Sequence, residues 1–276
     1  MRLGILGLGL IGGSLGRDLS ALGHHVCGVT TQESEAQTAI SMGAAAEAGT
    51  DLALLSACEV VILCVPIPAI LPMIECLTQI LDPSTVLTDV GSVKASIVHD
   101  AEKLWPHFVG GHPMAGTTSR GMAAAQRHLF RGRPYVVTPT ENTDHHALGV
   151  IIEMVKSLDA TCITMDCDTH DRSVARISHL PVFVSAALLL NLGDDPDASK
   201  LASSGFFDTS RVGGGNPALG LAMAQGNQAK LVAELRSYRQ HLEKLEQAVA
   251  ESDWQTVSAA LAWSNQRRTQ LFPEKG

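Results

Sequence analysis

Three glycines near the start of the chain constrain its fold more than any other feature. Residues 7–12 read Gly-Leu-Gly-Leu-Ile-Gly, the spacing GxGxxG, between an apolar run at Leu3–Leu6 and a helical stretch at Gly12–Leu22. In dinucleotide folds, the first glycine permits a tight turn, the second lets a pyrophosphate approach, and the third lets helix and strand pack closely. A glycine-rich turn without a ligand is the alternative. The pattern predicts a cofactor-binding turn made of Gly7, Leu8, Gly9, Leu10, Ile11 and Gly12.

Short apolar runs alternate with helical stretches over the first 165 residues. This alternation indicates a parallel sheet covered by helices on both faces. We therefore expect an α/β fold, a Rossmann-type doubly wound parallel sheet, as a dinucleotide-binding domain at residues 1–165. The predicted strands are Leu3–Leu6, His25–Val29, Val60–Val65, Val86–Val90, Phe108–Gly110, Tyr135–Thr138 and Cys162–Met165.

The strand patterns stop after residue 165. Long helical patterns cover Asp168–Leu192, with a bend at Pro181, and Ala218–Ala250. A third helix runs over 252–271, and Ser252 or Asp253 caps its start. Residues 166–276 are thus predicted to form an all-helical domain for substrate binding and dimerisation. Its long apolar stretches exceed what about 110 residues can bury alone, which predicts a homodimer.

Charge and cysteine content narrow the choice of partners. The chain of 276 residues has 20 Lys and Arg against 28 Asp and Glu, a net charge of -8. An acidic surface repels phosphate backbones and anionic lipids, and no apolar run reaches the roughly 20 residues of a membrane span. We expect no nucleic-acid or membrane partner. The six cysteines form no CxxC pair, which favours free thiols in a reducing, cytoplasmic compartment.

The end of the second predicted strand bears on the choice between NAD and NADP. An acidic residue there would bind the ribose 2′-hydroxyl and repel a 2′-phosphate. Thr30, Thr31 and Gln32 follow the strand instead, with no carboxylate before Glu33. Threonine hydroxyls can donate to a phosphate, although no Lys or Arg is nearby, and a polar loop that selects neither cofactor is the alternative. We favour NADP over NAD.

Several polar side chains follow other strands at the edge where open α/β sheets bind ligands. Val65 and Pro66 end the third strand and are expected beside the cofactor. His112 is the candidate general base, because a histidine titrates near neutral pH. Ser92 is expected to hydrogen-bond its imidazole. Lys94 either faces the substrate or opens the following helix, and we include it among the substrate-binding candidates.

The helical half carries a second polar cluster. His170 and His179 are nine residues apart, a spacing that does not put both on one helix face, so we predict no metal site there. Arg211 follows a Ser-, Thr- and Gly-rich segment and suits bidentate capture of a carboxylate. A surface arginine that caps a helix is the alternative.

These motifs together resemble the prephenate/arogenate dehydrogenase family over nearly the whole chain. The matching segments are Gly7–Gly12, Asp89–Lys94, Gly111–Thr117, Ser178–Pro181 and Asp208–Pro217. The resemblance implies a dinucleotide-binding domain followed by a helical domain that dimerises. It also implies that His112 is catalytic, that Ser92 supports it, and that Arg211 and His179 belong to the substrate site.

The residue after the SHLP segment bears on the substrate. Many similar enzymes that take prephenate have a second histidine there, whereas this chain has Val182, as in similar arogenate-specific enzymes that use NADP. The resemblance thus implies oxidative decarboxylation of L-arogenate to L-tyrosine, in tyrosine biosynthesis. The alternatives are an NAD-dependent prephenate dehydrogenase that gives 4-hydroxyphenylpyruvate, a non-catalytic dinucleotide-sensing regulator, and a helical assembly module with a vestigial cofactor fold.

Overall fold

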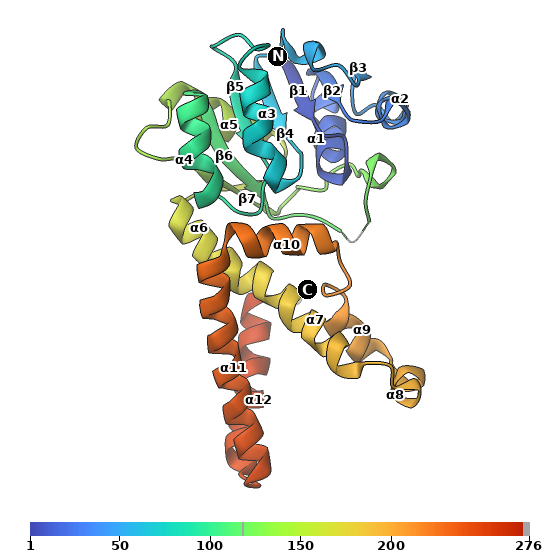
Figure 1. Cartoon of the computed structure of the whole chain (residues 1–276), viewed down its shortest axis with the longest axis vertical. Coiled ribbons are helices and arrows are strands. Elements are labelled where there is room, and N and C mark those ends of the chain that lie inside the picture. The colour runs from blue at the N-terminus through green and yellow to red at the C-terminus, as the bar shows by residue number, and fades with distance from the viewer. Residues whose placement is uncertain (118, 273–276) are drawn as a thin grey trace. The chain divides into compact units, whose positions relative to one another are not determined.

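The computed structural model describes residues 1–117 and 119–272, and its strands form an eight-stranded sheet (Figure 1). The strand order is β3-β2-β1-β4-β5-β6-β7-β8. The order reverses at β1, which pairs with β2 on one side and β4 on the other. The strands are β1 Arg2–Leu6, β2 His25–Val29, β3 Glu47–Gly49, β4 Val60–Leu63, β5 Val86–Asp89, β6 Phe108–Pro113, β7 Pro134–Thr138 and β8 Thr161–Thr164.

The predicted doubly wound sheet is confirmed, with one antiparallel pair in place of a fully parallel sheet. β6 and β7 run antiparallel, with His112 opposite Val136. A parallel connection needs a crossover, usually a helix. Between these two strands the described residues form only a short 3₁₀ turn, η3, at Met122–Ala124. The chain therefore turns back beside β6.

Alternate residues of the strands enter two separate cores, one on each face of the sheet. On one face, Leu3 and Ile5 pack with residues of α1 and α5. On the other, Val61 and Leu63 pack with residues of α3 and α4. The helices of this region are α1 Leu10–Ala21, α2 Glu33–Ser41, α3 Ile70–Leu77, α4 Ala95–Leu104 and α5 His145–Ser157, with 3₁₀ turns η1 Leu52–Leu55 and η2 Ile67–Ala69.

The predicted long helix with a bend near Pro181 is two α-helices joined by a π-helical turn. α6 covers Cys167–Val174, the π turn Ala175–His179, and α7 Leu180–Leu192. Pro181 has no N–H for an α-helical bond to residue 177, and a π turn absorbs such a break in the ladder. The helix α10, Pro217–Gly226, lies against the edge of the sheet where Val93 follows β5 (Figure 1).

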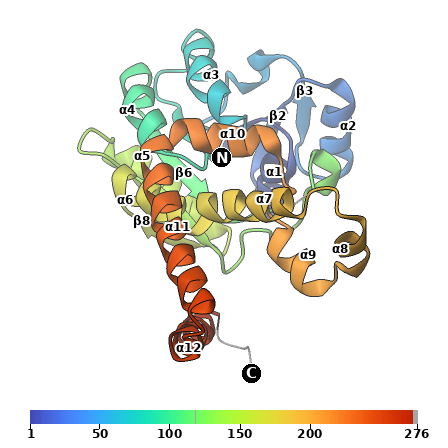
Figure 2. The same cartoon turned by 60° about the horizontal axis from the view of Figure 1, so that its bottom comes forward.

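Two short helices follow α7. Figure 2 shows α8, Pro196–Leu201, and α9, Ser204–Ser210, gathered at the far end of α7.

The predicted helix over 218–250 is broken at Asn227 into α10 and α11, Gln228–Ala250. The last helix, α12, covers Trp254–Leu271, and the Asp253 carboxylate accepts from the backbone N–H of Thr256, which confirms the predicted cap. The chain divides into two compact units, Met1–Gln228 and Ala229–Gly276. A functional division at residue 165 stays a prediction.

Candidate active site

His112 lies at the carboxyl-terminal end of β6, where only small residues can precede it. A Cβ atom on Gly111 would lie 2.8 Å from the backbone oxygen of Asp89, and one on Gly110 would collide with the Thr138 side chain. The two glycines thus let β6 pass closely between its neighbours. His112 itself is buried, with 7% of its surface exposed.

A chain of hydrogen bonds runs from His112 into the protein. Its Nδ1 lies 2.8 Å from Nε2 of His170, and Nδ1 of His170 lies 2.7 Å from Oδ1 of Asp171. The Asp171 carboxylate also accepts from the backbone N–H groups of Lys94 (2.8 Å) and Ala95 (2.9 Å), at the start of α4. The two imidazole rings meet edge to face, with their centroids 5.1 Å apart. From the sequence, His170 was a candidate metal ligand only, and this role was not predicted.

The predicted hydrogen bond between Ser92 and His112 is absent. His170 occupies Nδ1 of His112, and the Ser92 hydroxyl is buried with no partner among the described residues. The backbone oxygen of Ser92 instead lies 3.3 Å from Nε2 of His179. Ser92 therefore helps to hold His179 rather than the imidazole of His112.

The surroundings of Lys94 favour a role within the protein over contact with the substrate. Its side chain is fully buried, and the ammonium group is bonded to the Asp89 carboxylate and to the backbone oxygen of Gly111 at 2.7 Å. An ammonium buried in this way is satisfied only by such partners. Lys94 therefore ties β5 to β6 beneath His112, at the position just before α4.

The surroundings of His179 likewise do not favour direct contact with a substrate. The ring is fully buried, and the Asn227 amide donates to its Nδ1 at 3.4 Å. The same amide donates to the backbone oxygen of Asp171 at 2.7 Å. Both ring nitrogens of His179 thus face protein groups, and the residue joins α10 to the segment that carries Asp171.

Burial keeps His112 and His179 neutral. It is the main cause that lowers the pKa of His112 well below the usual value, and the neighbouring His170, Lys94 and His179 act in the same direction. Burial likewise lowers the pKa of His179, against the opposing effect of Ser92. At neutral pH, His112 is a free base that can accept a proton, which is what a general base requires.

Arg211 supplies an exposed cation at the end of α9. Its guanidinium makes no hydrogen bond to any residue that the structure describes. The loop around it is held in place, because the Ser185 hydroxyl donates to the backbone oxygen of Thr209 and accepts from the N–H of Gly213, at 2.9 and 2.8 Å. Arg120, which sequence reasoning did not consider, donates to the backbone oxygen of Gly215 at 3.3 Å. That bond connects this loop to the segment after His112.

The glycine turn has the shape that a dinucleotide requires. Gly7 has a φ of +103°, and a Cβ on it would collide with the backbone of Cys64. A Cβ on Gly12 would collide with the backbone oxygen of Gly7. At Gly9 nothing lies within 4 Å of a Cβ, and no side chain caps α1 there. An open space thus faces the N–H groups of a helix start, which fits a pyrophosphate.

We expect Gly9→Ala to weaken cofactor binding while the fold survives. The new methyl group meets no protein atom but fills the space that the pyrophosphate would enter. Titration of NAD and NADP should show at least about a tenfold loss of affinity, roughly 1.4 kcal/mol, with an unchanged melting temperature. The contrasting variant Gly12→Ala should instead lower the melting temperature. Unchanged cofactor affinity in Gly9→Ala would contradict the assignment of the turn.

The polar residues after β2 lie differently from expectation. The Thr30 hydroxyl donates to Oε2 of Glu35 on α2 at 2.9 Å, so it is not free to donate to a phosphate. Thr31 and Gln32 are exposed, and no side chain caps α2. Val65 and Pro66 follow β4 beside the glycine turn, since a Cβ on Gly7 would lie 3.2 Å from the backbone nitrogen of Val65.

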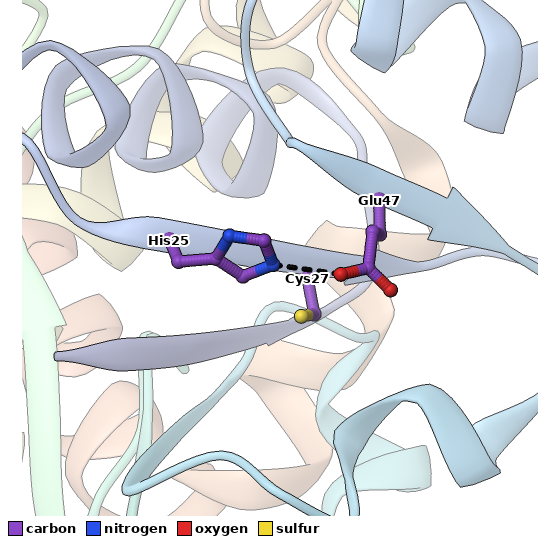
Figure 3. Close-up of side chains that lie close together, drawn as sticks. All are labelled: His25, Cys27 and Glu47. Atoms are coloured by element: carbon purple, nitrogen blue, oxygen red, sulfur yellow. Dashed lines mark hydrogen bonds and ion pairs between the residues drawn. The ribbon is translucent and has the colours of Figure 1, made fainter.

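A separate cluster lies at the other end of β2. Figure 3 shows the His25 ring and the Glu47 carboxylate pointing toward one another next to Cys27. Among the described residues these three alone form a group that could hold a metal, with their ligand atoms within 4.8 Å of one another. The Arg2 guanidinium already lies 3.2 Å from Oε1 of Glu47, and the His25 ring 2.8 Å from the same oxygen. An ion-pair network across β1, β2 and β3 accounts for this cluster without a metal.

Comparison with known proteins agrees with this geometry. The sequence model of the prephenate dehydrogenase nucleotide-binding domain matches residues 15–164, and that of the prephenate dehydrogenase dimerisation domain matches residues 166–263. The chain is 29% identical to a prephenate dehydrogenase of Bacillus subtilis over 260 residues, 90% of this chain and 70% of that protein. It is 28% identical to a cyclohexadienyl dehydrogenase of Zymomonas mobilis over 262 residues, 91% of this chain and 89% of that protein.

Solved structures extend the likeness to the whole fold. A Synechocystis arogenate dehydrogenase is 44% identical to this chain and superposes with a TM-score of 0.84. The match covers 98% of this chain and 100% of that chain. A prephenate dehydrogenase of A. aeolicus, in complex with hydroxyphenyl propionate and NAD+, is 25% identical, with a TM-score of 0.93 and 98% of each chain covered. With both domains matched, the chain belongs to the prephenate/arogenate dehydrogenase family.

Proposed function

We propose that the protein oxidatively decarboxylates L-arogenate to L-tyrosine with NADP as hydride acceptor, in tyrosine biosynthesis. The observation that carries the proposal is the buried, neutral imidazole of His112 at the edge of the sheet that also holds the glycine turn. The 44% identity to a Synechocystis arogenate dehydrogenase and Val182 after SHLP support arogenate as the substrate.

The residues of the site divide the chemical task. Nε2 of His112 accepts the proton of the C4 hydroxyl, so that a carbonyl can form as hydride leaves the same carbon. Arg211 binds a substrate carboxylate and orients the ring. The glycine turn and the start of α1 hold the pyrophosphate of the cofactor, whose nicotinamide supplies the hydride acceptor. Loss of CO₂ from the resulting dienone is driven by aromatisation, so the protein needs no further acid or base for it.

The choice of NADP rests on the exposed segment after β2. Thr31, Gln32 and the uncapped N–H groups of α2 offer donors to a 2′-phosphate, and positions 30–32 hold no carboxylate. Glu35 opposes this choice, because its carboxylate lies next to Thr30. The rival function, an NAD-dependent prephenate dehydrogenase, is favoured by that carboxylate and by the NAD+ bound to the A. aeolicus relative.

Glu35 offers a test of cofactor choice. We expect Glu35→Gln to tighten NADP binding severalfold and to leave NAD binding within about twofold, because only the 2′-phosphate is repelled by the charge. The matched control Glu33→Gln removes an exposed carboxylate of the same helix that does not contact Thr30, and its effect should be smaller. Equal effects of Glu35→Gln on both cofactors in fluorescence titrations would contradict a role in selection.

The substrate itself is decided by a steady-state assay. Arogenate and prephenate are each measured against NAD and NADP, and kcat/KM should be highest for arogenate with NADP. A higher value for prephenate with NAD would establish the rival function. Binding of a dinucleotide without turnover of either substrate would favour a sensing protein.

We also propose that the protein is a cytoplasmic homodimer. The matching dimerisation domain supports assembly, and apolar side chains are exposed along the helices of both compact units. The helical stretch Cys167–Leu192 has the length and hydropathy of a membrane span. Within one copy of the chain, only 22% of its most apolar window is buried, so much of this apolar surface is left uncovered. Packing against a second copy would cover such a surface. The most exposed apolar side chains are Ile177, Leu190, Leu201, Phe207, Leu221, Trp254, Leu261, Trp263 and Phe272.

Leu190 on α7 is suited to test the dimer, because 82% of its surface is exposed. In analytical ultracentrifugation at micromolar concentration, we expect the wild type to sediment as a dimer. Leu190→Glu should raise the dissociation constant at least about tenfold, since a carboxylate in an apolar interface loses its hydration. The control is Leu22→Glu, which changes an exposed leucine at the end of α1 and should leave the dissociation constant unchanged. A monomeric wild type would contradict the proposal.

A further inference from the structure

We propose that His170 and Asp171 are positioning residues that fix the tautomer of His112, with the proton on Nδ1 and the free electron pair on Nε2. The kinetic part of this proposal rests on the proposed dehydrogenase reaction, whereas the tautomer does not. No motif of the sequence assigned these residues a part in the chemistry.

Asp171 lies at the buried end of the hydrogen-bond chain. Three donors surround the Asp171 carboxylate: the backbone N–H groups of Lys94 and Ala95, and the ring of His170. Burial acts to raise the pKa of Asp171, but the bonds from His170 and from the two backbone groups outweigh it and lower the pKa. The carboxylate is therefore ionised at neutral pH and only accepts hydrogen bonds. Nδ1 of His170 must carry a proton.

That proton decides the role of the other nitrogen. In the proposed arrangement His170 carries a single N–H, on Nδ1, which leaves its Nε2 as an acceptor. It lies 2.8 Å from Nδ1 of His112, which must then be the donor. His112 is neutral, because its pKa is lowered, and its only proton is on Nδ1. Nε2 of His112 is left with a free electron pair and has no hydrogen-bond partner among the described residues.

The same chain stabilises the product of the proton transfer. When the substrate O–H bond breaks, its proton forms a bond to Nε2, and His112 becomes an imidazolium. Burial disfavours a positive charge on this ring, and His170, Lys94 and His179 act in the same direction. The N–H on Nδ1 still points to His170, and the negative charge of Asp171 lies at the far end of the chain. No proton has to leave His170 or reach Asp171. The arrangement is comparable to a serine–histidine–aspartate triad with one more imidazole inserted, and in that triad too the aspartate stays unprotonated.

Nitrogen-15 NMR of histidine-labelled protein tests the tautomer directly. With no substrate or cofactor added, at neutral pH, His112 should show a protonated Nδ1 and an unprotonated Nε2, assigned by its loss in His112→Asn. The opposite pattern would overturn the proposal, because it would mean that His170 donates to His112 from a doubly protonated ring. This measurement stands even if neither arogenate nor prephenate is turned over.

Kinetics of His170→Phe test the consequence. Phenylalanine keeps the ring volume but removes both nitrogens, so kcat should fall about tenfold to a hundredfold while KM and cofactor affinity stay within about threefold. The control His99→Phe changes an exposed histidine of α4 and should leave kcat unchanged. In the NMR spectrum of His170→Phe, the proton of His112 should no longer be confined to Nδ1. Unchanged kcat in a folded variant would overturn the proposal.

Asp171→Asn provides a second route if His170→Phe does not fold. The amide has nearly the shape of the carboxylate but no charge, so it no longer forces the proton of His170 onto Nδ1. We expect kcat to fall by about tenfold to a hundredfold, as in His170→Phe. This is less than the roughly four decades seen when the carboxylate of a serine–histidine–aspartate triad is neutralised, because another imidazole lies between Asp171 and His112. A wild-type kcat together with an unchanged His112 tautomer would show that Asp171 only holds α4, and would overturn its positioning role.

Discussion

Replacing His112 with asparagine is expected to lower kcat by roughly two to four decades, the usual contribution of a general base. Asparagine can still donate from its amide toward His170, so the buried hydrogen bond of the site has a replacement. It has no group that accepts the substrate proton at neutral pH. Stopped-flow and steady-state measurements of NADPH or NADH formation would measure the loss, with whichever substrate and cofactor the wild type prefers.

Two further measurements make this result specific. The cofactor dissociation constant should stay close to wild type, because His112 is not part of the glycine turn. The melting temperature should also stay close to wild type, because the asparagine amide replaces the hydrogen bond to His170. The remaining activity should also lose the fall of kcat/KM at acidic pH. In the wild type that fall lies below the usual histidine pKa, since the pKa of His112 is lowered. Turnover near the wild-type level would refute the assignment of His112 as base.

Most strands of the sheet could be predicted because each is a short apolar run that is recognisable from its own residues, without knowledge of the strand it pairs with. Val60–Leu63 is buried on both sides, as its composition indicates. The sequence pattern missed β3, Glu47–Gly49, because three residues show no periodicity, and the strand exists only by pairing with β2. The direction of β7 also depends on the path of the preceding segment rather than on its residues.

Site residues could be predicted where a local sequence motif indicates their role. Contacts between segments far apart in the sequence could not be predicted. The glycines and His112 were found from spacing and strand ends. The bond between His112 and His170 joins residues 58 positions apart, so no local pattern announces it. Lys94 shows the limit of reading charge alone: its charge suggested a ligand contact, whereas the fold buries it against Asp89.

Arg211→Ala is expected to raise KM for the substrate by about two decades with a smaller change in kcat. Both candidate substrates carry two carboxylates, and an acidic protein can hold such anionic groups only with a local cation. Losing a bidentate contact in a site that the substrate closes off from water costs on the order of 2–4 kcal/mol. The carboxylate is bound in the ground and transition states alike, so the loss falls on KM.

The size of the effect also decides between the two interpretations of Arg211. An arginine that stays in water contributes about 0–1 kcal/mol to an ion pair, which would change KM no more than about fivefold. Arg172→Ala is the matched control, because Arg172 is an exposed arginine of α6 that already pairs with Asp168. If KM stays constant while kcat collapses, Arg211 does not bind the substrate. The carboxylate would then have to be bound by another cation, and Arg120, whose guanidinium already donates to Gly215 of the Arg211 loop, is the next to replace.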